Sequence, residues 1–394
     1  MAFLLGIDQG TTQTTAVVID DRGNLLAQRS AQLPVHFPRP GWVEQDPWEI
    51  LRTVRETAAP LIETYPIAAV GLDNQGETFL LWDAKTGRPL TPAIVWQDKR
   101  GESVCQLLRQ NVDEEWISGK TGLLLDSYFS APKLRYVLDN DPVLQEAARQ
   151  GRLCFGTTDS WVLWHLSGGR LHITDPSTAS RTLLFDIQRL DWDEELLELF
   201  NVPRAILPQV RPSAGWVGEV EFGIGKALPL YALLVDQQAA LFGQACFAPG
   251  DMKCTFGTGS FLLMNIGSEP RLSSHALLTT VAWQISGRTV FALDGGIFVT
   301  GAAVQWLAEN LHLLPDVAAS AEIARQSDDL AVTFVPALAG LAAPHWQTQV
   351  RGAIFGLSRA TTPADIVRAT LDGIACRVYE VVKAMEQDAG IGPT

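Results

Sequence analysis

The chain has 394 residues, of which 47% are hydrophobic and 19% are charged, and its formal net charge is −14. This length is more than one typical core organises, so two domains are expected, and the composition excludes a disordered chain. The chain has 44 acidic and 30 basic residues. It therefore lacks the basic surplus that would displace counterions from nucleic acids or acidic membranes, which argues against such partners.

The N-terminal part predicts a β-meander that is followed by a helix and a further strand. The predicted strands are 2–8, 10–20, 25–33 and 67–75, and the predicted helix is 48–65. The strand segments are rich in apolar and β-branched residues, whereas apolar residues recur at helical spacing in 48–65. Strands that alternate with helices in this way predict an α/β or α+β domain with a mixed sheet.

The middle of the chain is predicted to contain several helices. The clearest is LDWDEELLELF (190–200), because acidic residues near its start suit the helix dipole. LPLYALLV (228–235) is a continuous apolar run that ends at Asp236. Such a run predicts a strand that is buried on both faces.

After Asp236 the plan of the N-terminal part recurs. Residues 251–267 predict a strand, a Gly/Thr turn and a second strand, and 291–311 runs from a strand through glycines into a helix. The repetition predicts two related domains, residues 1–247 and residues 248–394.

Cysteine usage and the N-terminus indicate the compartment. The five cysteines form no CxxC pair, which argues against a zinc site and a disulfide framework and favours a reducing environment. The opening MAFLLGIDQG lacks the basic leader and the cleavage site of a signal peptide. No apolar run approaches the ~20 residues of a membrane-spanning helix. The sequence therefore predicts a cytoplasmic enzyme.

Two Gly/Thr turns, DQGTT (8–12) and TFGTGS (255–260), are candidates for phosphate binding. Glycine permits a close backbone approach, and successive amides and hydroxyls can face phosphate oxygens. Asp8, at a strand end, suits Mg²⁺ held through water. If the turns faced each other across a cleft, they would hold one polyphosphate from both sides. Each is also compatible with an ordinary hairpin, and neither matches the GxxxxGK[ST] loop.

Asp236 is the candidate base, with Gln237 beside it. Two interpretations stay open, because an aspartate between a buried strand and a helix is either an N-cap or a general base in a cleft. His165 and His172 lie around a predicted hairpin, and no Ser/His/Asp order accompanies them. These histidines are interpreted as structural.

A polar cluster in GLDNQGETFLLW (71–82) contains Glu77 and is accompanied by Trp96 and Tyr128 further along the chain. Aromatic faces with hydrogen-bonding groups at their edges suit a polyol, whose C–H faces are apolar and whose hydroxyls need partners. The alternative interpretation for each aromatic residue is core packing.

Segments in the same order along nearly the whole chain resemble the FGGY family of carbohydrate kinases, which share a core with actin and hexokinase. They are GIDQGTT (6–12), PGWVEQDP (40–47), NQGET (74–78), AIVWQDKR (93–100), TGLLLDSYFSAPKL (121–134), FGTTDSWVLWHLSGG (155–169), ASRTLLFDI (179–187), VDQQAALFGQ (235–244), FGTGSFLLMN (256–265), GAAVQWL (301–307) and RGAIFGLSRATTPADIVRATLDGIA (351–375). The segments between 121 and 187 point to the glycerol kinases within the family.

The resemblance implies an α/β fold with two ribonuclease H-like domains and a cleft between them. It also implies transfer of the ATP γ-phosphoryl to a polyol hydroxyl, converting glycerol to glycerol 3-phosphate, with ATP and Mg²⁺ as the small molecules involved. By resemblance, Asp236 is the base; Glu77, Trp96, Tyr128, Asp236 and Gln237 bind the polyol; Thr11, Thr12, Thr258, Gly301 and Gln305 bind the nucleotide; and Asp8 serves the metal.

The chain departs from the family pattern within the site. Gly76 stands where glycerol kinases carry an arginine that bonds substrate hydroxyls, and losing such a bond weakens binding roughly 10- to 100-fold. Alternatively, the gap admits a longer polyol or a ketose, or another side chain fills it. Thr15 stands where the family usually has an arginine that reaches the phosphates.

Two further departures concern regulation and the C-terminal domain. EFGIGKALP (221–229) lacks the glycine–arginine loop that binds a sugar bisphosphate inhibitor, so this regulation is not expected. Family members continue past the position of Thr394 with a turn that holds the adenosine. The second domain is therefore expected to be C-terminally incomplete, which leaves a non-catalytic relative as an alternative function. The sequence leaves the oligomeric state open, and a homo-oligomer is compatible with it.

Overall fold

The computed structural model describes residues 2–327, 331–347 and 349–393. The chain divides into two compact units. Unit 1 comprises Met1–Ala240 and Thr280–Phe291, and unit 2 comprises Leu241–Thr279 and Ala292–Thr394. The domain boundary expected after residue 247 stays a prediction.

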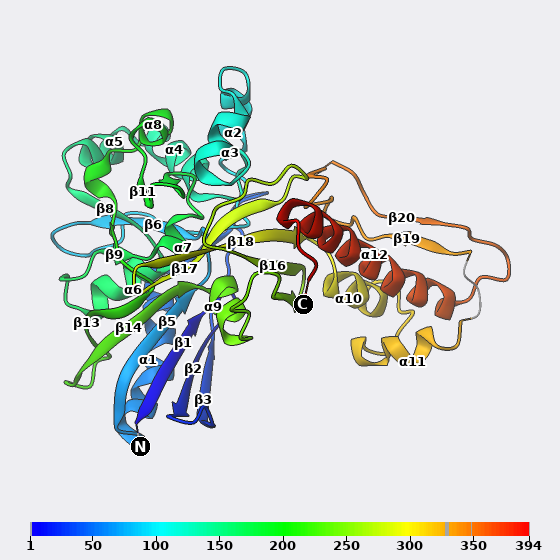
Figure 1. Cartoon of the computed structure of the whole chain (residues 1–394), viewed down its shortest axis with the longest axis horizontal. Coiled ribbons are helices and arrows are strands. Elements are labelled where there is room, and N and C mark those ends of the chain that lie inside the picture. Colours follow the sequence, from blue (N-terminus) through cyan, green and yellow to red (C-terminus); the bar gives the residue numbers. More distant parts are fainter. Residues whose placement is uncertain (1, 328–330, 348, 394) are drawn as a thin grey trace. The chain divides into compact units, whose positions relative to one another are not determined.

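Unit 1 is built on a mixed sheet with the strand order β17-β13-β14-β5-β1-β2-β3 (Figure 1). The strands are β1 (Phe3–Gln9), β2 (Gln13–Asp20), β3 (Leu25–Gln32), β5 (Ile67–Asn74), β13 (Ala214–Glu221), β14 (Ala227–Val235) and β17 (Leu278–Ile285). β1, β2 and β3 form the predicted antiparallel meander, while β5 runs parallel to both β1 and β14. The carboxyl ends of β1, β5 and β14 therefore lie at the same edge of the sheet.

One face of this sheet packs on α1 (Pro47–Thr64). Alternate strand residues such as Leu5, Ile7 and Val18 are buried in that core, as the period of a strand requires. α1 begins where sequence rules place it, because Asp46 accepts a hydrogen bond from the Trp48 N–H and proline occupies the first turn.

The expectation that the strand ending at Asp236 is buried on both faces is wrong, because along β14 Leu230 and Leu233 are buried whereas Tyr231 is 44% exposed. The strand lies in an open mixed sheet, whose second face is only partly covered.

A second sheet of unit 1, in the order β4-β7-β6-β8, supports the loops of the polar cluster. Its strands are β4 (Glu44–Gln45), β7 (Ala93–Ile94), β6 (Phe79–Asp83) and β8 (Leu153–Thr157). The remaining elements of this unit are α2 (Glu102–Arg109), α3 (Glu114–Thr121), α4 (Ser130–Asn140), α5 (Pro142–Arg149), α6 (Thr158–Leu166), β9 (Ile173–Thr174), α7 (Pro176–Ala179), β10 (Phe185–Asp186), β11 (Asp191–Trp192), α8 (Glu194–Leu199), η1 (Arg204–Ile206) and β12 (Gln209–Val210).

The helix predicted over 190–200 is wrong at its start. Asp191 and Trp192 form a short strand that pairs with β10, and α8 begins only at Glu194. Asp193 stops the helix from extending toward the N-terminus, because its side chain accepts from the Leu196 N–H as an N-cap does.

Unit 2 contains the second predicted hairpin, formed by β15 (Met252–Phe256) and β16 (Ser260–Gly267). Its other elements include α10 (Gly301–Glu309), η2 (Val317–Ala319), α11 (Ser320–Ala324), β19 (Thr333–Val335), β20 (Ala353–Phe355) and α12 (Pro363–Ala389). α9 (Asp236–Gly243) and β18 (Arg288–Ile297) each have residues in both units. Buried side chains of α10, β19 and α12 form a core in this unit. A capping box between Thr362 and Asp365 starts α12.

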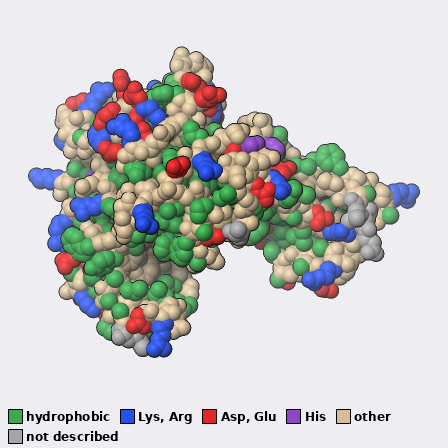
Figure 2. Space-filling model, in the orientation of Figure 1, with side chains coloured by type: hydrophobic (Ala, Val, Ile, Leu, Met, Phe, Trp, Pro, Cys, Tyr) green, Lys and Arg blue, Asp and Glu red, His purple; other side chains and the backbone are tan. Residues whose placement is uncertain are grey.

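Among the described residues, no helix combines the length and the apolarity needed to cross a bilayer. On the face drawn in Figure 2, acidic and basic side chains of the described residues lie interspersed with hydrophobic ones. This mixture is typical of a solvated surface.

Candidate active site

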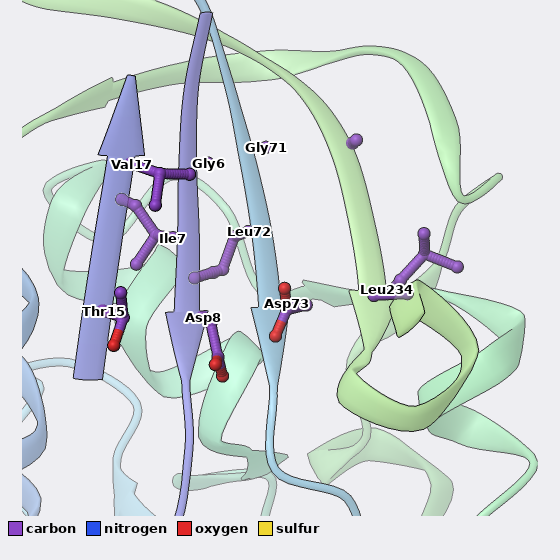
Figure 3. A pocket seen from close by; sticks show the side chains of 11 residues that line it. Gly6, Ile7, Asp8, Thr15, Val17, Gly71, Leu72, Asp73 and Leu234 are labelled. Atoms are coloured by element: carbon purple, nitrogen blue, oxygen red, sulfur yellow. The ribbon is translucent and has the colours of Figure 1, made fainter. Parts of the chain in front are cut away.

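Three aspartates lie at the carboxyl ends of adjacent strands in unit 1. Asp8 on β1 lies directly opposite Asp73 on β5 in the parallel register, and Asp236 follows the last residue of β14. Figure 3 shows the Asp8 and Asp73 side chains near the ends of these two neighbouring strands. In open α/β sheets, this edge is where ligands bind.

The carboxylates influence one another electrostatically. Burial raises the pKa of Asp73 well above its ordinary value, and the charges of Asp8 and Asp236 raise it further. Burial also raises the pKa of Asp8, although a hydrogen bond from Asp73 opposes this change. Two adjacent carboxylates resist simultaneous ionisation, so a nearby cation would favour the ionised form of this pair.

This carboxylate pair fits Mg²⁺ held through water. Within 2–327, 331–347 and 349–393, no group of three His, Cys, Asp or Glu side chains forms a direct metal-ligand set. Mg²⁺ keeps several of its waters and commonly uses only one or two carboxylates. The hollow beside the pair measures ≈ 330 Å³ and is lined by Gly6, Ile7, Asp8, Thr15, Val17, Gly71, Leu72, Asp73, Ala232, Leu234 and Ala239 (Figure 3).

Asp236 is the first residue of α9 and is half-buried. Its Oδ1 accepts a hydrogen bond from the Gln237 N–H at 2.7 Å. This bond is not that of an N-cap, whose side chain accepts from an N–H two or three residues further on. The half-buried carboxylate is held by its neighbour and retains exposed surface, which is compatible with the base interpretation. Gln237 beside it is also half-buried.

Trp96 and Tyr128 form an aromatic corner. Their rings are nearly perpendicular, at 87°, and the centroids are 5.5 Å apart. Both residues are half-buried, so neither is wholly absorbed by the core. The Trp96 indole Nε1–H donates to the Thr11 hydroxyl at 3.0 Å. This bond joins the aromatic corner to the first Gly/Thr turn.

Glu77 lies buried in the predicted polar cluster, 3% exposed, with φ of 59°. Its Oε1 accepts from Nε of Arg181 at 2.6 Å, and its carbonyl accepts from the Ser130 hydroxyl at 2.8 Å. The Arg181 side chain is 4% exposed. A buried pair of this kind fixes both side chains, since separating them would leave a charge in the core.

Lys133 is completely buried and hydrogen-bonds the backbone of the aromatic corner. Its ammonium donates to the carbonyls of Ser127 at 2.8 Å, of Tyr128 at 2.7 Å and of Trp96 at 3.4 Å. Burial lowers the pKa of Lys133 to about 7. The three acceptors match the three hydrogens of an ammonium.

Thr11 and Thr12 form the turn between β1 and β2, where Thr11 is half-buried and Thr12 is exposed. Thr15, which stands in place of the family's arginine, hydrogen-bonds Gln13 and Ser30. Both bonds engage the Thr15 hydroxyl with neighbouring residues of β2 and β3. The position therefore supplies no positive charge to the first turn.

In unit 2, the β15–β16 turn and the start of α10 are joined through the backbone. The Thr258 carbonyl accepts from the Thr300 and Ala302 N–H groups, and the Gly257 carbonyl accepts from the Gly301 N–H. The Thr258 side chain is exposed. Gln305, one turn further along α10, is also exposed and donates to Glu309 at 2.8 Å. The predicted residues Thr258 and Gly301 thus lie together.

The histidines occupy structural positions. His165 lies in α6 and not beside a hairpin, which corrects the expected placement. Its Nε2 contacts the Gly87 carbonyl at 3.1 Å, and Nε2 of His172 contacts the Phe155 carbonyl at 2.8 Å. Burial lowers the pKa of both rings.

The loop between β13 and β14 binds a carboxylate of the same chain, that of Glu221. The Glu221 carboxylate accepts from the backbone N–H groups of Gly223, Ile224 and Gly225, at 2.8, 2.6 and 2.7 Å. Although burial opposes the change, these amides lower the pKa of Glu221. Consecutive amides of this kind form an anion-binding nest, and here the nest is filled from within the chain.

Sequence reasoning missed Asp73, Arg181 and Lys133. Asp73 carried one usable signal, because it ends a strand predicted to be buried, as Asp8 does. Arg181 lies 104 residues from Glu77 in sequence, and no local pattern links them. Lys133 closes the quoted segment DSYFSAPK, but a lysine in a helix normally indicates a solvated face.

Comparison with known proteins connects these geometries to a family. The profile of the FGGY family of carbohydrate kinases, N-terminal domain, matches residues 3–243, and the C-terminal domain of the same family matches 252–394. The chain is 47% identical over 400 residues to glycerol kinase 2 of Thermotoga maritima, covering 99% of this chain and 80% of that protein. It is 48% identical over 399 residues to glycerol kinase of Thermus brockianus, covering 100% of this chain and 80% of that protein.

Solved structures agree with this assignment. A Plasmodium falciparum glycerol kinase with ADP has a TM-score of 0.93 and 34% sequence identity, over 100% of this chain and 80% of that one. A ligand-bound xylulose kinase of Lactobacillus acidophilus has a TM-score of 0.86 at 21% identity, over 98% of this chain and 78% of that one, and shows the shared fold. Matches to both family domains, together with relatives this similar over nearly the whole chain, show that the chain belongs to the FGGY family of carbohydrate kinases.

Proposed function

We propose that this kinase transfers the γ-phosphoryl group of ATP to glycerol and forms glycerol 3-phosphate. Relatives that are 46–48% identical over nearly the whole chain are named glycerol kinases, and one solved relative carries ADP. The observation that carries the proposal is the half-buried Asp236 carboxylate. It follows β14 at the same sheet edge as Asp8 and Asp73.

In the proposed reaction, Asp236 accepts the proton of a glycerol hydroxyl while that oxygen bonds to phosphorus and the bond to the leaving ADP oxygen breaks. Base, substrate and phosphate must be aligned, because phosphoryl transfer depends mainly on positioning and on charge neutralisation. Glu77 and Gln237 bond the polyol hydroxyls, and the rings of Trp96 and Tyr128 cover its C–H face. The fixed Glu77–Arg181 pair supports this role.

The nucleotide is proposed to contact both Gly/Thr turns. Thr11 and Thr12 of the first turn and Thr258 of the second would bond phosphate oxygens, with Gly301 and Gln305 near the nucleotide. Asp8 and Asp73 would hold Mg²⁺ through water, which relieves the repulsion that raises the Asp73 pKa. When bound, the cation neutralises phosphate charge during transfer.

Replacing Asp236 with asparagine tests the base. Asp236→Asn keeps the shape and removes the proton acceptor, so glycerol-dependent ADP release should fall at least ~100-fold, as expected for loss of general-base catalysis. The matched control is Asp21→Asn in the exposed β2–β3 turn, which should retain full activity. Undiminished turnover in the Asp236 variant would contradict the base assignment.

A longer polyol or a ketose is a second candidate substrate, because Gly76 supplies no hydrogen-bonding side chain to the buried cluster, although Val235 occupies the space beside it. A coupled ADP assay over glycerol, four- and five-carbon polyols and ketoses ranks these substrates by kcat/KM. A preference for a larger substrate over glycerol would favour this candidate. Calorimetric binding of polyol without binding of ATP·Mg²⁺ would instead support a non-catalytic relative.

The compartment and the assembly are also proposals. The five cysteines are free in the structure, which supports a reducing compartment such as the cytoplasm. Cell fractionation would test that location. A homo-oligomer remains compatible with the chain, and sedimentation of the purified protein would measure it.

A further inference from the structure

The space beside Gly76 is occupied by a neighbouring strand. A Cβ atom added to Gly76 would lie 2.9 Å from Cγ2 of Val235 and 3.9 Å from Cγ of Arg181. The first distance is shorter than ordinary carbon contacts, so the valine would have to move. Val235 is 2% exposed, and its β-branched side chain has few alternative rotamers. Residue 76 therefore cannot gain a side chain while Val235 keeps its present position.

Val235 also directly precedes the proposed base, Asp236, on β14. Its backbone N–H donates to the Ser177 hydroxyl at 3.0 Å, and this bond fixes the strand end. Gly76 directly precedes Glu77 in the buried polar cluster. The valine methyl thus lies between the segment that carries the base and the segment that carries a proposed polyol ligand.

Positive charge reaches this part of the site from elsewhere in the chain. The Arg181 guanidinium carbon lies 5.8 Å from the Tyr128 ring centroid and 5.5 Å from that of Phe129. Its Nε bonds Glu77. The cluster therefore retains the Arg181 guanidinium although residue 76 is glycine. Because Arg181 lies in a segment that resembles the family, the departure at position 76 changes the shape of the site as well as its charge.

We propose that Val235 is the residue that limits the length of the polyol accepted by this kinase, through the space that it shares with Gly76. This proposal rests on the proposed function. An apolar wall excludes a longer substrate by its volume, and one methylene in such a pocket changes kcat/KM about 10- to 200-fold. Shortening valine to alanine removes two methyl groups from the wall and should admit a larger substrate.

The test compares Val235→Ala with wild type at saturating ATP, using glycerol and a four-carbon polyol. The ratio of kcat/KM for the four-carbon polyol to that for glycerol should rise at least ~10-fold. KM for ATP should stay within about twofold, because no proposed nucleotide contact is altered. Val70→Ala, in the core of β5 and also 2% exposed, is the control for loss of a buried valine. An unchanged ratio, or an equal change in both variants, would overturn the proposal.

A second comparison tests the shared space without depending on the substrate. Gly76→Ala should lower the melting temperature of wild type more than it lowers that of Val235→Ala, because neighbouring sites couple. Purely additive effects on melting temperature would contradict the packing relation. If wild type phosphorylates no polyol, the proposed function fails, whereas this thermal coupling still reports on the Gly76–Val235 contact.

Discussion

The two Gly/Thr turns look alike in sequence but are held by different means. In the first, side chains hold the turn, because the Trp96 indole donates to the Thr11 hydroxyl and the Gln45 amide donates to the Thr11 carbonyl. In the second, backbone groups of α10 donate to the carbonyls of Gly257 and Thr258. Similar motifs thus acquire their geometry from different neighbours.

The difference predicts which substitutions each turn tolerates. A turn held by side chains should respond gradually, since each hydrogen bond contributes about 0.5–1.5 kcal/mol. A turn held against a helix by close backbone contact should respond abruptly to any added atom. At Gly301, an added Cβ would overlap the Gly257 carbonyl oxygen.

Gly301→Ala should have the largest effect, because the second turn must move to admit the new methyl group. We expect kcat/KM for ATP to fall at least ~100-fold, since misplacement of about 1 Å has such effects. The free energy of unfolding should fall by about 1–3 kcal/mol, as in other overpacked sites. Steady-state kinetics and urea denaturation measure the two quantities.

Gly257→Ala is the matched control within the same turn. The nearest atom to an added Cβ there is the Gly259 carbonyl oxygen at 3.6 Å, which is an ordinary contact. This variant should keep its kcat/KM within a few-fold. Equal losses in both variants would show that backbone contact with α10 does not distinguish the two positions.

Lys133→Met should have the next largest effect, now on the aromatic corner attached to the first turn. The substitution leaves the carbonyls of Trp96, Ser127 and Tyr128 without their donor. We expect KM for glycerol to rise about tenfold and stability to fall by about 2 kcal/mol. KM for ATP should change less, and an equal rise in both KM values would contradict a role at the corner.

The same variant tests a dependence on pH. Burial lowers the pKa of Lys133 to about 7, whereas an unfolded lysine titrates near ~10.4. Between these values the unfolded chain binds more protons, so the contribution of Lys133 to stability should rise with pH. The free energy of unfolding of wild type minus that of Lys133→Met should therefore increase from pH 7 to pH 10. A flat difference would indicate that the amine keeps its ordinary pKa.

Trp96→Phe should have a moderate effect, because it removes the indole donor to Thr11 and keeps an aromatic face. The loss of one hydrogen bond predicts a rise in the KM for glycerol of about 3- to 10-fold. Trp216→Phe, which changes an exposed side chain on β13, is the control and should behave as wild type. If Trp96→Phe abolished activity, the first turn would be as intolerant as the second.

Glu221→Gln should have the smallest effect, since the β13–β14 loop lies outside both turns. The neutral amide oxygen still accepts from the nest of backbone N–H groups, so stability should fall by less than about 1 kcal/mol. The loss should be present at neutral pH and disappear in acid, because the lowered pKa of Glu221 keeps wild type charged down to lower pH. Thermal melts at two pH values measure this difference.

Much of the fold followed from local pattern. β1, β2, β3, β5, β14 and α1 lie within a few residues of their predicted positions, because alternation, apolar runs and helical spacing are local properties. The start of α8 was misjudged, since the acidic residues that favour a helix also serve as its cap. Pattern alone did not separate Asp193 as a cap from Asp193 as a helical residue.

The site was less predictable where it depends on long-range pairing. Asp73 acquires its raised pKa from the parallel register that places it opposite Asp8. Arg181 reaches Glu77 through folding of the intervening chain, and Val235 meets Gly76 in the same way. Such contacts depend on three-dimensional packing, so residue spacing alone carries no signal for them.

The left-handed backbone of Glu77 has a consequence for thermal adaptation. A non-glycine residue at φ 59° stores roughly 1–3 kcal/mol of strain, and here the bonds from Arg181 and Ser130 oppose its release. Glycine at position 77 would relax the backbone, but it would break the buried pair with Arg181 and remove the carboxylate proposed to bond the polyol, and breaking such a pair costs about 3–5 kcal/mol. The expected net effect on heat resistance is therefore a loss, and a more heat-resistant variant should gain its stability elsewhere in the chain.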